Sequence, residues 1–562
     1  VLAMNHFFLA VVIIIGSGIL PLLFLWRRFV LMKAVASFGL TAGCLIGLID
    51  AVVKLSHGVD WVSSATYLHA FYLAFRMDGL SAFFLMAIFL VSLLASVYSY
   101  HYMSDTRKTI RVAVHYLFFS LLVASMALVV TAANMITFML CWEIMSLASF
   151  FLVVYNYEND GNRKAGFLYF IFSQVGAMVI LAAFGVIYSH AASFGFDAAG
   201  ALPETAKMIV FVLAFIGFGS KAGVFPFHVW LPHAHPAASS HISAVMSGVM
   251  IKTGIYGIIR IYMMLDWHIS LFGHLVLIAG MVSGVLGVVY ALGQHDLKRL
   301  LAYHSVENIG IILIGIGIGM LGVAAGNPVM AVLGFAGGLL HVLNHAIFKS
   351  LLFMGAGMVL HKTGTRIIDL LGGLIKKMKI TGITFLIGSL AICGLPPLNG
   401  FVSEFLVYMG SFQGMALDKT SFAMCLLAIV SLAIIGGLAL ACFTKVVGVV
   451  FQGEPRSQVA ENTDEKGLTM LVPMLILAAA CILIGVFPTF FMAMAVKAVA
   501  SLELGYGGIP LKPFFELTGN ISRTAALVFA VFLLIVAFEI DQYPQAWHYP
   551  QAGQVTQRIE LN

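Results

Sequence analysis

Apolar runs of about twenty residues, separated by short polar segments, recur from one end of the chain to the other. A run of this length crosses the hydrocarbon core of a bilayer as a helix, and a helix satisfies its own backbone where no water is present. The runs are too long and too continuously apolar for barrel strands. We therefore predict an all-α polytopic membrane protein with about 15 transmembrane helices. They lie near residues 6–26, 34–55, 79–100, 113–132, 135–155, 165–189, 207–230, 238–264, 270–292, 300–322, 330–358, 380–411, 421–449, 468–496 and 524–540.

Proline and glycine interrupt two of these runs. The seventh contains Pro226 and is followed directly by Pro232 and Pro236, and the twelfth contains two prolines and two glycines within residues 394–400. Irregular backbone at membrane depth persists only where it is packed in protein or lines water. Because the breaks are five runs apart, a five-helix repeat would be inverted in the membrane, and paired breaks of this kind point to a transport site. Ordinary proline kinks are the alternative reading of the breaks.

Lysine and arginine gather in the loops that follow odd-numbered runs, whereas the loops after even-numbered runs hold few, such as Lys207 and Lys419. An excess of these residues marks cytoplasmic loops. We therefore predict a multi-pass protein of the inner (cytoplasmic) membrane, with its N-terminus outside and its C-terminus inside. The basic loops contain Arg27, Arg28 and Lys33, then Arg107, Lys108 and Arg111, then Arg163 and Lys164, then Lys298 and Arg299, and finally Lys362, Arg366, Lys376, Lys377 and Lys379.

Composition supports the same class. Of the 562 residues, 61% are hydrophobic and only 10% are charged, against roughly 25% charged residues in soluble domains. The net charge of +6 comes from loop residues and forms no basic stripe with interleaved aromatics, so nucleic acid is not an expected partner. The six cysteines form no CxxC pair and lie in apolar runs, where they are typical of small core residues rather than of cluster ligands.

Ionisable side chains inside the predicted helices are the first functional candidates, because burying a charge in a membrane is costly. We expect them to transfer protons or sodium ions. The candidates are Glu143, Lys221, Lys252, Glu307, His341, His345, Lys349, Glu404 and Lys445.

Three of these candidates, His341, His345 and Lys349, are four residues apart and share one helix face. Imidazole titrates near neutrality and a buried lysine is readily neutralised, so the stripe favours a proton relay. A single histidine would more simply be a satisfied polar group. A metal site is the rival reading for the other histidine cluster, but no carboxylate accompanies it, and a wet loop or proton entrance fits better. That cluster consists of His228, His233, His235 and His241.

Glu143 and Lys221 carry opposite charges on neighbouring runs. If they approach, each stabilises the charged form of the other, and protonation would switch the pair. A static ion pair that only fixes helix packing is the alternative. Asp78, at the outer start of the third run, is predicted to cap or anchor its helix together with Arg76.

Taken together, these motifs resemble the antiporter-like membrane subunits of respiratory complex I, Mrp-type sodium/proton antiporters and membrane-bound nickel–iron hydrogenases. The resemblance covers about the first 500 residues. Residues 302–310 and 372–377 further resemble the large antiporter-like subunit of hydrogenase 4 and formate hydrogenlyase. The motifs that carry the family resemblance are residues 76–81, Trp142 to Ser146, Lys221 to Pro232, Lys252 to Gly254, His341 to Lys349, Gly394 to Pro397 and Ser403 to Phe405.

The resemblance implies a core of about fourteen helices with two inverted five-helix repeats. It also implies that Glu143 pairs with Lys221, and that a central hydrophilic axis runs through Lys252 and the histidine stripe to Glu404. The chain itself would hold no cofactor, and partner subunits would carry iron–sulfur and nickel–iron centres. We expect N-terminal helices in residues 1–112, repeats in 113–264 and 265–450, and C-terminal helices in 451–562.

One segment departs from the longest members of that family. They carry a long amphipathic helix along the membrane, whereas residues 499–523 are short and rich in glycine and proline, the poorest helix formers. We therefore expect no such helix there.

Three functions follow from these observations. The leading hypothesis is a proton-translocating subunit of a redox-driven complex, with membrane and peripheral redox subunits as partners. The second is a sodium/proton antiporter subunit without redox partners, and the third is a scaffold that anchors a soluble partner at the membrane.

Overall fold

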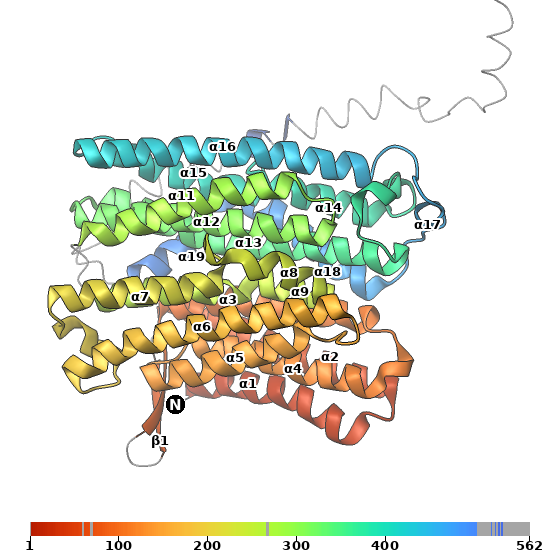
Figure 1. Ribbon diagram of the computed structural model, residues 1–562, viewed down its shortest axis with the longest axis horizontal. Helices are drawn as coiled ribbons and strands as arrows, with labels where there is room; N and C mark the ends of the chain where they lie inside the picture. The colour runs from red at the N-terminus through yellow and green to blue at the C-terminus, as the bar shows by residue number, and fades with distance from the viewer. Residues whose placement is uncertain are drawn as a thin grey trace, which may run out of the picture.

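The computed structural model describes residues 2–502, except 59–60, 68–70 and 266–268, together with a few positions between 519 and 531. Within these residues, thirteen helices are long and apolar enough to cross a membrane. They run roughly parallel in one bundle (Figure 1). This confirms the all-α polytopic fold that the hydrophobic pattern predicts.

The helices and strands follow one another along the chain, joined by short 3-10 and π-helical turns. They are α1 (Leu2–Leu20), α2 (Phe29–His57), β1 (Trp61–Tyr67), β2 (Phe71–Met77), α3 (Gly79–Tyr102), α4 (Thr109–Val129), α5 (Met135–Val153), α6 (Asp160–Ala191), α7 (Glu204–Ala222), α8 (Leu231–Ala237), α9 (Ser240–Val245), α10 (Lys252–Met264), α11 (Ser270–Leu292), α12 (Leu297–Ala324), α13 (Pro328–Thr363), α14 (Lys379–Ile392), α15 (Asn399–Gly414), α16 (Lys419–Val450), α17 (Gln458–Glu461), α18 (Leu468–Val486) and α19 (Pro488–Ala500).

Both predicted helix breaks are present. The seventh crossing is divided into α7 and α8 by residues 223–230, and the twelfth into α14 and α15 by residues 393–398. A third break, which we did not predict, divides the fourteenth crossing into α18 and α19 at Phe487. The cause is Pro488, because a proline lacks the helical N–H and forces the preceding residue out of helical geometry. The predicted fifteenth helix, 524–540, and most of segment 499–523 fall outside the region in which the structure describes continuous chain.

A two-stranded antiparallel hairpin of β1 and β2 joins α2 to α3, and the hydrophobic pattern did not predict it. Strand β2 also bonds to the turn between α4 and α5, where the Ala133 amide donates to the Ala74 carbonyl. The hairpin lies at the opposite end of the bundle from α17 (Figure 1).

The centre of the bundle is formed by α12, α13 and the segment from α9 to α10, whose most apolar windows are entirely buried. In contrast, only about a third of the corresponding windows of α1 and α16 is buried, as expected for helices that face lipid. The buried helices carry most of the ionisable candidates, so the charges lie on the inside of the bundle.

The loops that follow the third, fifth, seventh and eleventh crossings meet around one pocket, lined by residues that include Asp105, Asn156, Pro236 and Arg366. We call this the basic end of the bundle, since the loops after the third, fifth and eleventh crossings belong to the set rich in lysine and arginine. At the other end, the C-terminal residues of α2 and α19 meet the start of α3.

Candidate functional site

Seven of the candidates are the ones that we expect to transfer protons directly. Six of the seven are buried inside the bundle, and the seventh, Glu143, is half-buried. The six are Lys221, Lys252, His341, His345, Lys349 and Glu404. Several buried hydroxyl, amide and imidazole groups lie between them. From Lys252 to Glu404, these side chains form a polar file through an otherwise apolar core, and Lys221 has its own set of partners.

The file begins at Lys252, where the helix is widened by a π-helical turn, Met246–Met250. Here the Ile251 amide donates to the Met246 carbonyl, five residues back, rather than to Ser247. The Ser247 carbonyl is therefore available, and it accepts a hydrogen bond of 2.5 Å from Lys252 Nζ. Such turns are frequent at functional sites. This one gives the buried amine a neutral partner.

Ser247 connects the file to α12. Its Oγ lies 2.8 Å from Ser305 Oγ on α12. One residue before Ser305, the buried His304 bonds through Nδ1 to the carboxylate of Glu307. His304 was missed at the level of sequence, although its position three residues before Glu307 places the two on one helix face.

A second set of bonds joins α12 to α13 and α15. Asn308 donates through Nδ2 to the His304 carbonyl at 2.8 Å, which turns its Oδ1 toward His341. His341 Nε2–H donates to that oxygen at 3.0 Å, and His341 Nδ1 lies 2.9 Å from Ser403 Oγ. Because Ser403 directly precedes Glu404, the file reaches the broken twelfth crossing.

Glu404 occupies space that the break creates. A Cβ atom added to Gly394 would lie 2.6 Å from the Glu404 carboxylate, and Gly394 has φ +64°. The positive φ favours glycine at this position, and any larger residue would also require the Glu404 carboxylate to move. The break between α14 and α15 therefore accommodates a carboxylate at membrane depth.

Several buried polar atoms of the file have no hydrogen-bond partner among the described residues. Leaving such an atom unsatisfied costs about 1–3 kcal/mol. Bridging water would satisfy these atoms and would also connect the file. They are both ring nitrogens of His235 and of His345, Lys349 Nζ, Glu307 Oε1 and His304 Nε2.

The predicted ion pair between Glu143 and Lys221 is not formed, which corrects our expectation. Lys221 Nζ lies at the end of α7 and donates to Tyr169 OH at 2.7 Å, Ser146 Oγ at 3.2 Å and Ser173 Oγ at 3.3 Å. The ring of Trp142 lies 5.9 Å from the same amine. Hydroxyl oxygens from α5 and α6 thus take the place that we assigned to the carboxylate.

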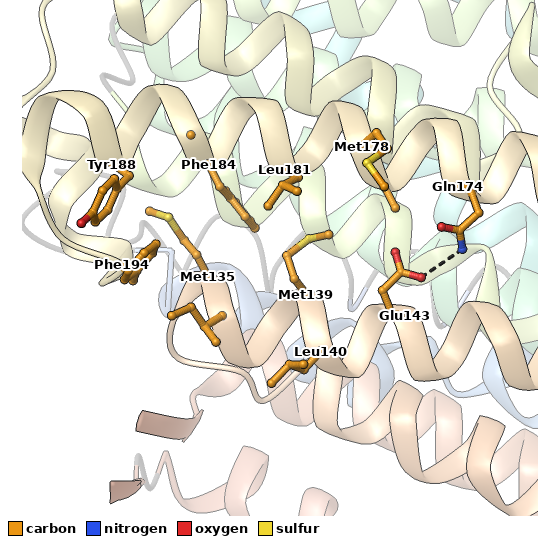
Figure 2. Close-up of a pocket in the computed structure, with 13 residues that line it drawn as sticks. Met135, Met139, Leu140, Glu143, Gln174, Met178, Leu181, Phe184, Tyr188 and Phe194 are labelled. Carbon is orange, nitrogen blue, oxygen red and sulfur yellow. Dashed lines mark hydrogen bonds between the residues drawn. The ribbon is translucent and has the colours of Figure 1, made fainter. Parts of the chain in front are cut away.

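Glu143 instead faces an apolar groove between α5 and α6, and accepts a hydrogen bond of 3.0 Å from Gln174 Nε2 (Figure 2). The groove has a volume of about 540 Å³, and residues such as Met139 and Met178 line it. Glu143 and Ser146 are three residues apart on α5 but have different surroundings, because Glu143 lines the groove and Ser146 accepts a hydrogen bond from Lys221.

Two further candidates, Lys445 and His228, make contacts of the kind that hold a fold together. Lys445 donates to the carbonyls of Leu292 and Gln294 at the end of α11, at 2.7 and 3.3 Å. This is the favourable position for a cation at a helix C-terminus. His228 is buried in the turn within the seventh-crossing break, with its ring stacked on Phe225.

Asp78 caps α3, as predicted, by accepting a bond of 2.8 Å from the Ser81 amide. Its charged partner is Arg260 on α10, which approaches the two carboxylate oxygens to 2.6 and 3.0 Å. From the sequence we expected Asp78 and Arg76 to cap or anchor the helix, and we named no charged partner for Asp78. Arg260 could not be identified because the fold alone brings α10 to the start of α3.

The four histidines considered as a metal site do not share one environment. His233 is exposed, whereas His228, His235 and His241 are buried. Among the described residues, no group of three or more histidine, cysteine, aspartate or glutamate side chains is placed to hold a metal ion. All six cysteines are buried and free.

Known proteins share both the sequence and the fold. A family profile described as "NADH:quinone oxidoreductase/Mrp antiporter, TM" matches residues 132–431, and one for the N-terminus of complex I chain 5 matches residues 61–111. Hydrogenase-4 component B of Escherichia coli is 41% identical over 460 residues, which cover 80% of this chain and 68% of that protein. Formate hydrogenlyase subunit 3 of Escherichia coli is 34% identical over 509 residues, covering 89% and 79%.

Among solved structures, a chain of the archaeal membrane-bound sulfane sulfur reductase superposes with a TM-score of 0.77 at 25% identity, covering 96% of this chain and 85% of that one. A chain of the Mrp complex from Dietzia superposes with a TM-score of 0.76 at 20% identity, covering 89% and 98%. The first match extends beyond the family profile to nearly the whole chain. The protein therefore belongs to the family of antiporter-like membrane subunits found in complex I, Mrp antiporters, hydrogenase 4 and formate hydrogenlyase.

Proposed function

We propose that this chain translocates protons as the antiporter-like subunit of a redox-driven membrane complex of the hydrogenase 4 or formate hydrogenlyase type. One observation carries the proposal: a file of buried polar groups extends from Lys252 through His341 to Glu404. An inert membrane scaffold has no need for such costly burial.

Protons would move between groups whose partners are neutral. Lys252 is held by a carbonyl and Lys221 by hydroxyls, so either amine can lose its proton without abandoning a buried carboxylate. In the file, His341 connects the amide of Asn308 to Ser403. Its two ring nitrogens allow a proton to enter on one side and leave on the other.

Redox energy would come from partner subunits. The relatives are named as components of hydrogenases, and we propose that iron–sulfur and nickel–iron centres lie in such partners. Purification of the tagged chain from native membranes, followed by mass spectrometry, tests this assignment. Recovery only with small antiporter subunits would favour sodium/proton exchange, and a single soluble partner without redox centres would favour a scaffold.

The decisive variant is Lys252→Met. Methionine fills a similar volume but carries no proton, so proton uptake per electron in membrane vesicles should fall to background in a normally assembled complex. Lys419→Met is the matched control, because Lys419 is exposed at the start of α16. An assembled Lys252→Met complex that pumps normally would refute the proposal.

A further inference from the structure

Two buried histidines outside the file face one another near the basic end. His115 on α4 and His241 on α9 place their Nε2 atoms 2.8 Å apart, and both rings are almost fully buried. At this distance one nitrogen must donate and the other accept, so the pair shares one proton. Neither Nδ1 atom has a partner among the described residues.

Two tyrosines separate the pair from a polar pocket. The Tyr155 ring packs against His115 with a centroid distance of 5.0 Å, and Tyr102 packs against His241 at 5.5 Å. Both tyrosines also line the pocket. Tyr102 OH lies 3.2 Å from Ser240 Oγ, next to His241 in the chain.

The pocket lies at the basic end and has a volume of about 390 Å³. Charged and polar side chains from four loops line it, in contrast to the apolar groove beside Glu143. Its polar lining includes Ser104, Asp105, Lys108, Asn159, Asn162, Ser239 and Arg366.

A buried amine continues the path inward. Lys298 donates to the carbonyl of Ala238 at 2.6 Å, and Ala238 itself lines the pocket. Lys298 lies within electrostatic range of His241 and His235, where like charges on these groups would repel. His235 in turn interacts with Lys252, the first residue of the file. At the level of sequence Lys298 counted only as a loop cation.

We propose that this pocket and the His115–His241 pair form the proton entrance that joins the basic end to the file. A proton binds His115 Nδ1, the shared proton passes from His115 Nε2 to His241 Nε2, and His241 releases the proton on its Nδ1 toward Lys298. Lys298 accepts this proton as the neutral amine. The transfer leaves the proton of His115 on Nδ1 and that of His241 on Nε2, and each ring returns to its starting tautomer by losing a proton from one nitrogen and gaining one on the other. The inference rests on the proposed function, since an entrance is needed only if the file carries protons.

The test measures redox-driven proton uptake per electron in vesicles that expose the basic end. Glutamine at either position retains a hydrogen bond but passes no proton, so His115→Gln and His241→Gln should each lower uptake at least tenfold. His101→Gln, an exposed histidine at the same end of α3, is the matched control and should leave uptake unchanged. Wild-type uptake in both assembled variants would overturn the entrance.

A second variant leaves the buried pair intact. Asn162→Trp fills the pocket from α6 and should slow uptake several-fold, which keeps the test decisive if a histidine variant does not assemble. If Asn162→Trp then pumps at the wild-type rate, the entrance is wrong. Lys252→Met distinguishes the two proposals: when it abolishes uptake but the entrance variants do not, only the entrance fails.

Discussion

The buried cations of this protein differ in the chemistry of their partners. Lys221 and Lys252 are held by uncharged oxygens, whereas Arg260 is held by a carboxylate. Deprotonating an amine with neutral partners leaves no unpaired charge behind. Breaking a buried ion pair does leave one, and typically costs about 3–5 kcal/mol.

Asp78→Asn should therefore destabilise the protein by about 3 kcal/mol, because it leaves Arg260 buried without a countercharge. Thermal denaturation of the purified protein measures the effect. The double variant Asp78→Asn, Arg260→Gln should recover part of the loss. Asp105→Asn, in an exposed loop, serves as the control. Equal stability of Asp78→Asn and the control would contradict a structural ion pair.

At the scale of helices, three of the proposed proton-transfer groups coincide with departures from regular geometry. Lys221 ends α7 at the first break, Lys252 follows a π-helical turn, and Glu404 lies beside the second break. The third break adds to the same region, because Gly485 at the end of α18 packs directly on Pro397. Broken backbone therefore concentrates around the file.

Gly394→Ala tests whether the second break must accommodate Glu404. Alanine at φ +64° costs roughly 1–2 kcal/mol, and its Cβ would displace the carboxylate. We expect lower thermal stability together with at least tenfold lower proton uptake per electron. Gly436→Ala is the matched control, since nothing lies within 4 Å of its added Cβ. Normal proton uptake in Gly394→Ala would show that transport does not depend on glycine at this break.

The loop before α18 is attached to α13 by Asp464, which bonds to Lys466 at 2.7 Å and to Lys362 at 2.9 Å. These hydrogen bonds lower the pKa of Asp464 from 3.8 to about 2. A carboxyl with a depressed folded pKa contributes stability above its unfolded pKa and loses it as the pH falls through the folded value.

Asp464→Asn should therefore be slightly less stable than the wild type at pH 6, with the difference vanishing as the pH falls from about 4 to about 2. Thermal denaturation across this range checks the sign. The contribution is small because the pair is exposed. A difference that grows toward acid pH would contradict the assignment.

At the scale of the whole molecule, the loops divide between two ends. Tyr102, Asn156 and Arg366 meet at one end, and His57, Gly79 and Ser501 at the other. This division agrees with the alternating crossings that the lysine and arginine bias predicts. The bias further predicts that the first end is cytoplasmic.

Cysteine labelling tests that orientation. In the background of the six buried native cysteines, Ser104→Cys should react with an impermeant maleimide only in inside-out vesicles. His57→Cys should react only in right-side-out vesicles or intact cells. Both positions are exposed. The reverse pattern would place the N-terminus inside and move the proposed proton entrance to the outer side.

The sequence by itself determined the class of protein, the positions of its first fourteen crossings, two of its breaks and most of its buried ionisable groups. These features are local, since a long apolar run has no stable alternative to a membrane helix. A proline inside a helix or a charge buried in the membrane likewise costs free energy whatever the surrounding fold. The π-helical turn before Lys252 has no comparable sequence signal.

Only the tertiary structure decided which of these groups meet. It paired Lys221 with hydroxyls instead of Glu143, and it paired Asp78 with an arginine 182 residues away. It also brought His115 to His241 across 126 residues. Side chains on one helix point in several directions, and contacts between helices depend on packing angles that no single segment encodes. Partners in a polar file are therefore a property of the assembled bundle.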